Sequence, residues 1–256
     1  MIEPIFKIFP QQLTEDLCKA VDDEEKGRIY TTRQGVAYSS ITTILSKTLS
    51  KEKSEILKSW KERVGEEEAE AIKDYAAERG GELHSIVEDY LLGKDYSKKL
   101  LTSSKAVPRL FNQVKPIVTK RINNIRLIEK PLYSTGLKVA GRVDLIAEFD
   151  NKLSIIDFKT STKVKTIDMI EDYFIQETAY AVMYMEHFGE KIEQLVTIIA
   201  TENSLKPYVY TKTPIEYLDK LTNRVKMYYK EETNGISNHL QENSNRRDSV
   251  LATRTT

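Results

Sequence analysis

Two neighbouring β-rich segments that meet at Asp150-Asn151 constrain this chain more than any other feature. Both residues tolerate left-handed backbone angles, so the stretch 141–160 is predicted to form a hairpin with a two-residue loop. The register of such a hairpin places Asp144 directly opposite Asp157, with their Cβ atoms about 4.5–5.5 Å apart. Most residues around them are apolar, so the two carboxylates face each other in a setting that disfavours charge.

Two like charges that face each other destabilise a hairpin unless a partner neutralises them. A divalent cation meets this requirement, and carboxylate oxygens are ligands that suit Mg²⁺ or Mn²⁺. Lys159 follows Asp157 by two residues and so lies on the same face, where its ammonium group can hold or deprotonate a metal-associated water. The competing interpretation is a surface hairpin with scattered charges or a plain Asp–Lys ion pair, since the tripeptide Asp-x-Lys is common.

The whole chain is predicted to adopt an α/β fold, in which helices flank one central mixed β-sheet, a restriction-endonuclease-like core with an N-terminal helical region. The expected helices are a short one near Pro10–Asp22, one capped by Ser39 or Ser40, one or two over 54–76, then Glu82–Leu92, 105–124, Asp168–Phe188 and Pro214–Glu231. The expected strands are a pair around Arg28–Tyr38, then Ile125–Tyr133, Gly141–Phe149, Lys152–Thr160, Gln194–Thr201 and Lys206–Thr211.

The sequence also predicts where helices are interrupted and how the chain divides into regions. Gly80-Gly81 is expected to interrupt the helical region, and Pro116 to kink or break its helix. Four apolar residues of 54–76 are expected to face inward: Leu57, Trp60, Val64 and Ile72. Residues 1–104 are expected to form an N-terminal irregular and helical region, 105–235 the core, and 236–256 a disordered tail rich in Ser, Asn, Arg and Thr.

Charge is balanced overall but segregated along the chain. The 256 residues include 39 basic and 39 acidic side chains, which argues against a protein that coats nucleic acid indiscriminately. Residues 62–89 hold ten acidic and three basic residues, whereas 105–130 hold seven basic residues and one acid. The basic segment either forms a solvated helix face or contacts a polyanion, and the charge pattern alone leaves both interpretations open.

Cysteine usage and hydropathy exclude several classes of protein. A single Cys excludes a disulfide framework and any site built from several thiolates. No apolar run is long enough to span a membrane, and the N-terminus lacks the pattern of a signal peptide. We therefore expect no membrane partner and a cytoplasmic location, in a bacterium or a phage-infected bacterial host.

Two helical pairs place polar groups at i, i+4 spacing, which puts both members of a pair on one helix face. His84 precedes Glu88 by four residues and could supply an imidazole ligand to the metal. Gln176 precedes Tyr180 in the same way, on the helix that follows the hairpin. Taken alone, such a His is more often a packed or solvated residue, and such a Gln–Tyr pair an ordinary helix face.

Together these residues resemble the motifs of the PD-(D/E)XK nuclease superfamily, in its RecB-like branch. The motifs are Gly80-x-x-x-His84, Gly141-Arg142-Val143-Asp144, Asp157-Phe158-Lys159 and Gln176-x-x-x-Tyr180. With Ser40–Leu45 and Trp60, the chain looks closest to bacteriophage exonucleases that resemble the mitochondrial genome maintenance exonucleases, over roughly residues 38–230. Two features depart from the family: Val143 stands where the Pro of the family name is expected, and Cys18 alone cannot hold the iron–sulfur cluster of some relatives.

The resemblance implies a role for each matching residue. Asp144 and Asp157 would bind Mg²⁺ or Mn²⁺, with the Phe158 carbonyl and His84 as further ligands and without an iron–sulfur cluster. Lys159 would position and activate the attacking water. Supporting roles fall to Gln176 and Tyr180, next to the scissile strand, and to Glu88, which would orient His84 or approach a second metal. Four basic residues are expected to contact the nucleic-acid backbone: Lys163, Lys165, Lys120 and Arg121.

The implied activity is that of a metal-dependent DNA exonuclease that hydrolyses phosphodiester bonds and prefers single-stranded DNA ends. Replication, recombination or repair is its expected setting, with proteins of these processes as further partners. Residues 40–92 are expected to build part of a helical arch through which a single strand passes. Two alternatives are a structure-specific or single-strand endonuclease of the same superfamily and a non-catalytic nucleic-acid-binding protein on this fold. The opposed carboxylates argue against the second, since a protein that only binds DNA does not need them.

Overall fold

Strand β5 (Val139–Phe149) organises the eight-stranded mixed sheet of the computed structural model, which describes residues 6–9 and 15–230. One edge of β5 pairs along most of its length with the antiparallel strand β4 (Ile122–Ser134). The other edge is divided, because 139–140 pair in parallel with β3 whereas 145–149 pair antiparallel with β6. The described part of the chain places no strand against 141–144 on that second edge, so the sheet forks there.

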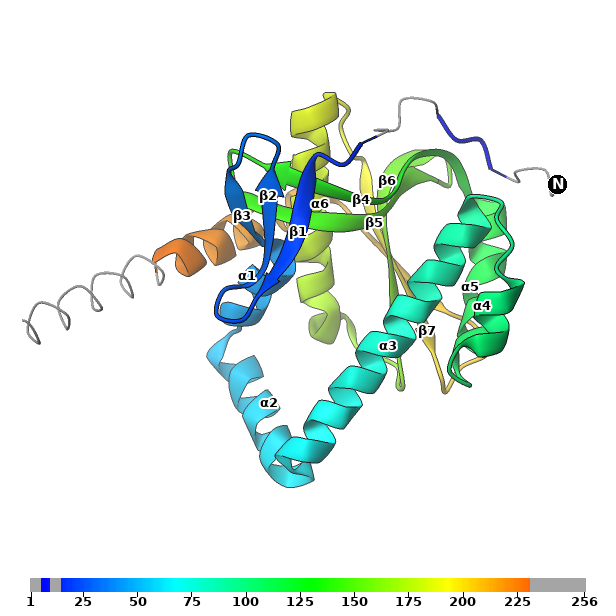
Figure 1. Cartoon of the computed structure of the whole chain (residues 1–256), viewed down its shortest axis with the longest axis horizontal. Helices are drawn as coiled ribbons and strands as arrows, with labels where there is room; N and C mark the ends of the chain where they lie inside the picture. Colours follow the sequence, from blue (N-terminus) through cyan, green and yellow to red (C-terminus); the bar gives the residue numbers. More distant parts are fainter. Residues whose placement is uncertain (1–5, 10–14, 231–256) are drawn as a thin grey trace, which may run out of the picture.

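The strand order is β1-β2-β3-β5-β6-β7-β8, and β4 pairs with β5 outside this path (Figure 1). The remaining strands are β1 (Cys18–Asp23), β2 (Gly27–Thr32), β3 (Ala37–Ser40), β6 (Lys152–Ser161), β7 (Gln194–Thr201) and β8 (Tyr208–Lys212). Strands β6 and β7 run parallel, whereas β7 and β8 run antiparallel. The predicted α/β class with a mixed central sheet is therefore confirmed.

Helices cover both faces of this sheet (Figure 1). Helices α1 and α6 and the helix over 218–230 pack on one face, and the C-terminal half of α3 packs with α5 on the other. The helices are α1 (Ile41–Lys47), α2 (Lys51–Val64), α3 (Glu66–Leu91), α4 (Ser97–Thr102), α5 (Val107–Arg121) and α6 (Glu171–Phe188), with 3₁₀ turns at Ile167–Ile170 and Pro214–Glu216. Within the described ranges, no helix is both long enough and apolar enough to cross a membrane.

The predicted hairpin between β5 and β6 is confirmed. Asp150 and Asn151 adopt φ angles of 51° and 64°, the left-handed values that a tight two-residue turn requires. The ladder begins with Phe149 opposite Lys152, which fixes the register of every later pair. The predicted cap is also present: the Ser40 hydroxyl accepts a hydrogen bond from the Thr43 amide and begins α1.

Two local predictions are wrong, and of the kink or break expected at Pro116 the break does not occur. Residues 18–22 of the first expected helix form strand β1 instead, because they pair with β2 across a turn in which Asp23 accepts hydrogen bonds from two backbone amides. Gly80-Gly81 does not interrupt α3, since the low helix propensity of glycine is outweighed by packing of the following turns. Pro116 does not break α5, which continues to Arg121. Residues 10–14 of the expected first helix and 231–256, with the expected tail, lie outside the described residues.

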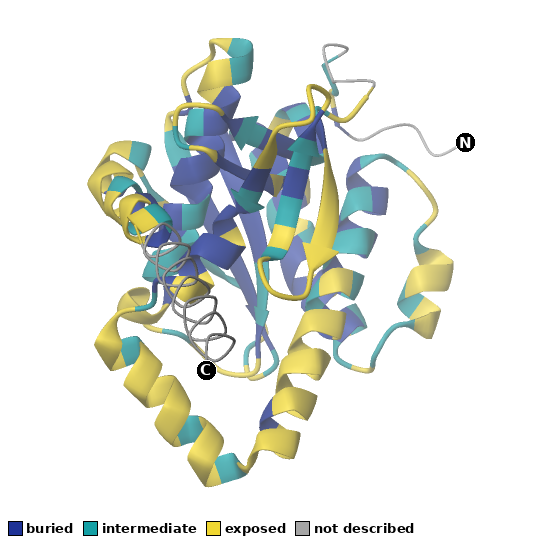
Figure 2. Cartoon of the chain, turned by 60° about the vertical axis from the view of Figure 1, so that its left-hand side comes forward, coloured by how far each residue is buried: buried dark blue, intermediate teal, exposed yellow. Residues whose placement is uncertain are grey.

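The apolar residues of 54–76 are also less buried than predicted. Leu57 and Ile72 are 43% and 42% exposed, whereas Trp60 and Val64 are half-buried. The reason is that α2 and the first half of α3 project away from the sheet and form two legs of an arch, almost entirely exposed in Figure 2. The apolar residues that recur at helical spacing in this segment therefore have no sheet to pack against.

We predict that G141A destabilises the protein by about 1–3 kcal/mol, the range observed for overpacked interiors. A Cβ at Gly141 would lie 2.7 Å from Cε1 of Tyr180 and 3.2 Å from Cγ2 of Ile41, so both neighbours must move. The matched control is G81A, because Gly81 lies in α3 where an added Cβ would meet no atom within 4 Å, and alanine favours helix by about 0.5–1 kcal/mol. Chemical denaturation of both variants measures the difference, and a G141A protein as stable as wild type would contradict the close approach.

Candidate active site

The predicted catalytic residues gather where β5 and β6 separate. The last ladder pair is Leu145–Ile156, and Asp144 and Asp157 occupy the next position beyond it. Here the Phe158 amide donates a hydrogen bond of 2.9 Å to Oδ2 of Asp144, which bridges the two diverging strands. Because the strands no longer pair, side chains from the helices on both faces of the sheet can reach the two aspartates.

Asp157 and Lys159 form a buried ion pair on β6. Asp157 is 1% exposed, and its Oδ2 contacts the Lys159 ammonium group. Neither carboxylate oxygen accepts a regular hydrogen bond from the described residues, so this ion pair is its main compensation for lost water. Burial raises the pKa of Asp157 to about 6, with the Lys159 charge opposing the rise and the Asp144 charge adding to it. The charge of Lys159 therefore does not fully offset the cost of burying the ionised Asp157 carboxylate.

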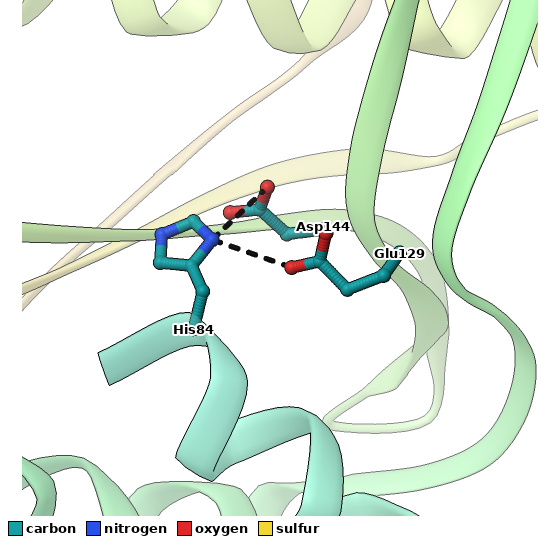
Figure 3. A group of neighbouring side chains, drawn as sticks. All are labelled: His84, Glu129 and Asp144. Carbon is teal, nitrogen blue, oxygen red and sulfur yellow. Dashed lines mark hydrogen bonds and ion pairs between the residues drawn. The ribbon is translucent and has the colours of Figure 1, made fainter. Parts of the chain in front are cut away.

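His84 reaches this site from α3 and contacts groups on three strands (Figure 3). Its Nδ1 lies 3.3 Å from Oε1 of Glu129 and 3.6 Å from Oδ1 of Asp144. Its Nε2 lies 2.7 Å from the Phe158 carbonyl oxygen, which can only accept, so Nε2 carries a proton in this arrangement. Burial lowers the pKa of His84, but the Asp144 charge and the hydrogen bond to Glu129 outweigh it and raise the pKa to about 9.

Glu129 belongs to this cluster but was not among the residues selected from the sequence. It lies on β4 between pairs that match Ile128 with Leu145 and Lys130 with Val143, so it stands opposite Asp144. Its φ of 48° is left-handed, an unfavourable conformation for Glu that the surrounding strands enforce. The sequence offered one signal, because Glu129 is the single acid of β4, and the short turn over 135–138 sets the register that places it opposite Asp144.

Glu88 was the carboxylate predicted to orient His84, but the structure places Glu129 at the His84 ring instead. Glu129 contacts Nδ1 directly and also forms an ion pair of 2.9 Å with Nε of Arg142. Glu88 is half-buried one turn along α3, and its carboxylate makes no hydrogen bond or ion pair within residues 6–9 and 15–230. With Glu129 at Nδ1 and the Phe158 carbonyl at Nε2, the orientation of the imidazole is fixed from both sides.

Helix α6 supplies the other predicted pair from the opposite face of the sheet. Nε2 of Gln176 donates a hydrogen bond of 3.0 Å to the Tyr180 hydroxyl. Burial raises the pKa of Tyr180 well above its usual value, and the charges of Asp144 and Asp157 raise it further. The phenol therefore stays neutral, and because its oxygen accepts from Gln176, its own proton is free to donate toward the fork.

The four predicted DNA-binding residues fall into two separate places. Lys163 is exposed and Lys165 half-buried just beyond the end of β6, on the side of the aspartates. Lys120 and Arg121 end α5 beside the hairpin turn, where the Arg121 carbonyl accepts from the Asp150 amide. Five residues of β5 separate that turn from Asp144, about 20 Å at strand spacing. The Arg121 guanidinium is also paired with the Asp150 carboxylate, at 2.5 Å.

The donor atoms of this cluster fit a hard divalent cation. Single ligand atoms of His84, Glu129 and Asp144 lie within 4.8 Å of one another. The Phe158 carbonyl adjoins the same imidazole, and the buried Asp157 carboxylate lacks regular hydrogen bonds. Carboxylate and carbonyl oxygens with one imidazole suit Mg²⁺ or Mn²⁺, whereas thiolates, which softer metals prefer, are absent from the described site.

Comparison with known proteins relates this site to nucleases. The sequence model of the PD-(D/E)XK nuclease superfamily matches residues 28–247. The chain is 31% identical over 130 residues to mitochondrial genome maintenance exonuclease 1 of Xenopus tropicalis, covering 49% of this chain and 37% of that protein. The mouse protein of the same name is 29% identical over 170 residues, covering 63% of this chain and 49% of the relative.

The chain is also similar to a human relative and to one solved structure. The human protein of that name is 30% identical over 150 residues, covering 55% of this chain and 42% of the relative, so the chain spans half or less of each of these proteins. A crystal structure of a putative exonuclease from Eubacterium rectale aligns with 58% of this chain and 64% of its own, at 18% identity and a TM-score of 0.39.

We predict that the metal-free protein loses stability as pH rises from 6.5 to about 9, through His84. Its folded pKa is raised from 6.5 to about 9, so the stabilisation is complete below pH 6.5 and is lost as pH passes the folded value. The expected contribution is about 1–3 kcal/mol. Chemical denaturation in EDTA across this range measures it, with H84Q as the comparison, since its curve should be flatter. A wild-type curve parallel to that of H84Q would contradict the assignment.

Proposed function

Because this chain belongs to the PD-(D/E)XK nuclease superfamily, we propose that it is a metal-dependent deoxyribonuclease that removes nucleotides from single-stranded DNA ends. The observation that carries this proposal is the fork of β5 and β6, where two carboxylates and a lysine meet an imidazole from α3. A protein that only bound DNA would gain nothing from burying Asp157 with incomplete compensation. The relatives named above are exonucleases by name, which agrees with this reaction class.

The proposed ligands of the Mg²⁺ or Mn²⁺ ion are Asp144, Asp157, His84 and the Phe158 carbonyl. Glu129 holds Nδ1 of His84 and is a further carboxylate within reach of the site. When bound, the cation would supply positive charge to the phosphate as negative charge grows on it during in-line attack. The chain's own proposed part is to hold these ligands near one another before the substrate arrives, and the contact of His84 with Asp144 and with the Phe158 carbonyl supports this.

Lys159 is the residue proposed to position the attacking water. Burial lowers the pKa of its ammonium group, but the charges of Asp157 and Asp144 outweigh burial and raise it above the usual value. The side chain is therefore protonated near neutral pH, and it acts by donating hydrogen bonds to water and phosphate oxygens rather than by removing a proton. Its 21% exposure leaves the ammonium group accessible to both.

Gln176 and Tyr180 are proposed to complete the site from α6. The neutral phenol, oriented by Gln176, can donate to a phosphate oxygen of the scissile strand. The absence of a side chain at Gly141 allows this ring to approach β5 so closely. Glu88 remains a proposed supporting residue, placed on the same helix as His84 and available for a second cation.

The preference for single-stranded ends is proposed from the arch of α2 and the first half of α3. Figure 1 shows α2 and α3 diverging from the body and meeting at the turn around Gly65, and the second leg runs on directly to His84. The proposal is that a flexible single strand passes between these two helices more readily than a stiff duplex, and that it enters by a free end. Lys58 and Lys61 line a pocket at the turn between α2 and α3, together with Glu62 and Glu66, and these lysines are proposed to contact phosphates.

The biological setting is proposed from the resemblance and from the relatives. Their name, mitochondrial genome maintenance exonuclease, connects them with DNA upkeep, so we propose replication, recombination or repair for this chain, with proteins of these processes as partners. A bacterial or phage-infected cytoplasm and a RecB-like phage lineage are part of the same proposal.

We predict that D157N and K159M each lower Mg²⁺- or Mn²⁺-dependent cleavage of end-labelled single-stranded DNA by about 100-fold or more. The first removes charge from the proposed ligand set, and the second removes the donor that positions the water. D219N is the matched control, because Asp219 is exposed on the helix over 218–230. Denaturing gels report cleavage and thermal melts report folding. Full activity in either folded variant would refute the assignment.

A covalently closed single-stranded circle separates exonuclease from endonuclease activity. We predict that the circle survives under conditions in which the same sequence, linearised, is degraded, since threading through the arch needs a free end. The two substrates, incubated together and resolved on one gel, provide an internal control for metal and enzyme concentration. Cleavage of the circle at the rate of the linear strand would favour the endonuclease alternative.

A further inference from the structure

Tyr173 occupies a place beside the proposed site that the mechanism above does not use. It lies on α6 three residues before Gln176 and seven before Tyr180, so all three side chains project from one face of the helix. Two ammonium groups flank its ring: Nζ of Lys159 and Nζ of Lys165 each lie 5.1 Å from the ring centroid. One aromatic side chain thus connects the catalytic lysine with a second cation.

Lys165 is held in place and is not neutralised. Its Nζ donates a hydrogen bond of 2.6 Å to the Tyr173 hydroxyl, and its backbone carbonyl accepts one of 3.1 Å from Tyr210. The side chain is half-buried, yet across the described ranges no carboxylate comes within ion-pair distance of it. A cation that is partly removed from water and lacks an acidic partner favours an anion at that position.

The acids nearest along α6 are already paired with other cations. Glu171 forms an ion pair with Lys220. Asp172 binds two cations, with Oδ2 at 3.2 Å from Lys53 and Oδ1 at 3.1 Å from Arg224. Lys159 is paired with Asp157, so Lys165 supplies the excess positive charge on this side of the fork.

We infer that Lys165 and Tyr173 bind the phosphate that neighbours the scissile phosphate, one nucleotide away along the same strand. The two ammonium nitrogens are at most twice 5.1 Å apart, a span that adjacent phosphates of one strand can bridge. The Tyr173 hydroxyl orients Lys165 at its own end of the ring, so that Lys165 and Lys159 can each meet a different phosphate. This inference rests on the proposed nuclease function and adds a specific contact to it.

The test uses oligonucleotides in which one linkage near the cleaved end is an uncharged methylphosphonate. With all-phosphate DNA, K165M should lower kcat/KM roughly 10-fold, the loss expected for one charge-assisted contact. A methylphosphonate at the contacted linkage should lower kcat/KM of wild type similarly, and should have no further effect on K165M. Y173F, which keeps the ring but loses the hydroxyl, should show a smaller loss at the same linkage.

Binding provides a readout without cleavage. In EDTA, fluorescence anisotropy with single-stranded DNA should show that K165M lowers the slope of log affinity against log salt by about 1. K191M is the matched control, because Lys191 is exposed beyond the opposite end of α6 and should leave slope and kinetics unchanged.

The outcomes separate the inference from the proposed function. K165M and the methylphosphonate each lower kcat/KM. If these two losses multiply at every linkage, the inferred contact is refuted, even if D157N is inactive as expected. A wild-type protein that cleaves no DNA with Mg²⁺ or Mn²⁺ would refute the function, whereas the salt slope would still test Lys165. If K165M does not fold, Y173F alone decides through its linkage dependence.

Discussion

The rest of this structure depends on the burial of one carboxylate, that of Asp157, beside Lys159. A buried ion pair of this kind stabilises a fold weakly or not at all, because desolvation offsets the attraction. The surrounding framework must therefore supply the stability, and it does so with apolar clusters on both faces of β6 and β7. The fork between β5 and β6 then opens this otherwise closed interior at one point, and both α3 and α6 deliver side chains to it.

Three carboxylates and two raised pKa values describe the electrostatics of the fork. Asp144, Asp157 and Glu129 bring three carboxylates to the fork. The Asp144 charge raises the pKa of His84, whereas burial is the main cause of the raised pKa of Asp157. A divalent cation held by the proposed ligands would add positive charge beside these carboxylates.

The hairpin could be predicted from the sequence because its two-residue turn fixes the register of β5 against β6, and with it the position of Asp144 relative to Asp157. Strands β4 and β5 are also joined by a local turn, over 135–138, but the strands predicted from the sequence ended at 133 and began again at 141, so the place of Glu129 opposite Asp144 was missed. For the arch, the helices could be predicted from the sequence but their packing could not. Its helices follow from their periodicity, but periodicity alone does not reveal that they lack a sheet to cover.

The arch has no core of its own, so its position relative to the aspartates is set by what holds its two legs. The first leg begins at α2, where Lys53 pairs with Asp172 at the start of α6. The second leg is held by buried Arg79, which donates to the Thr160 hydroxyl at 3.1 Å and pairs with Glu202 beyond β7. Thr160 directly follows Lys159 in β6, so the β-strand that carries Lys159 also holds the arch. The proposed path of single-stranded DNA and the lysine proposed to act in its cleavage would therefore be positioned by neighbouring residues of β6.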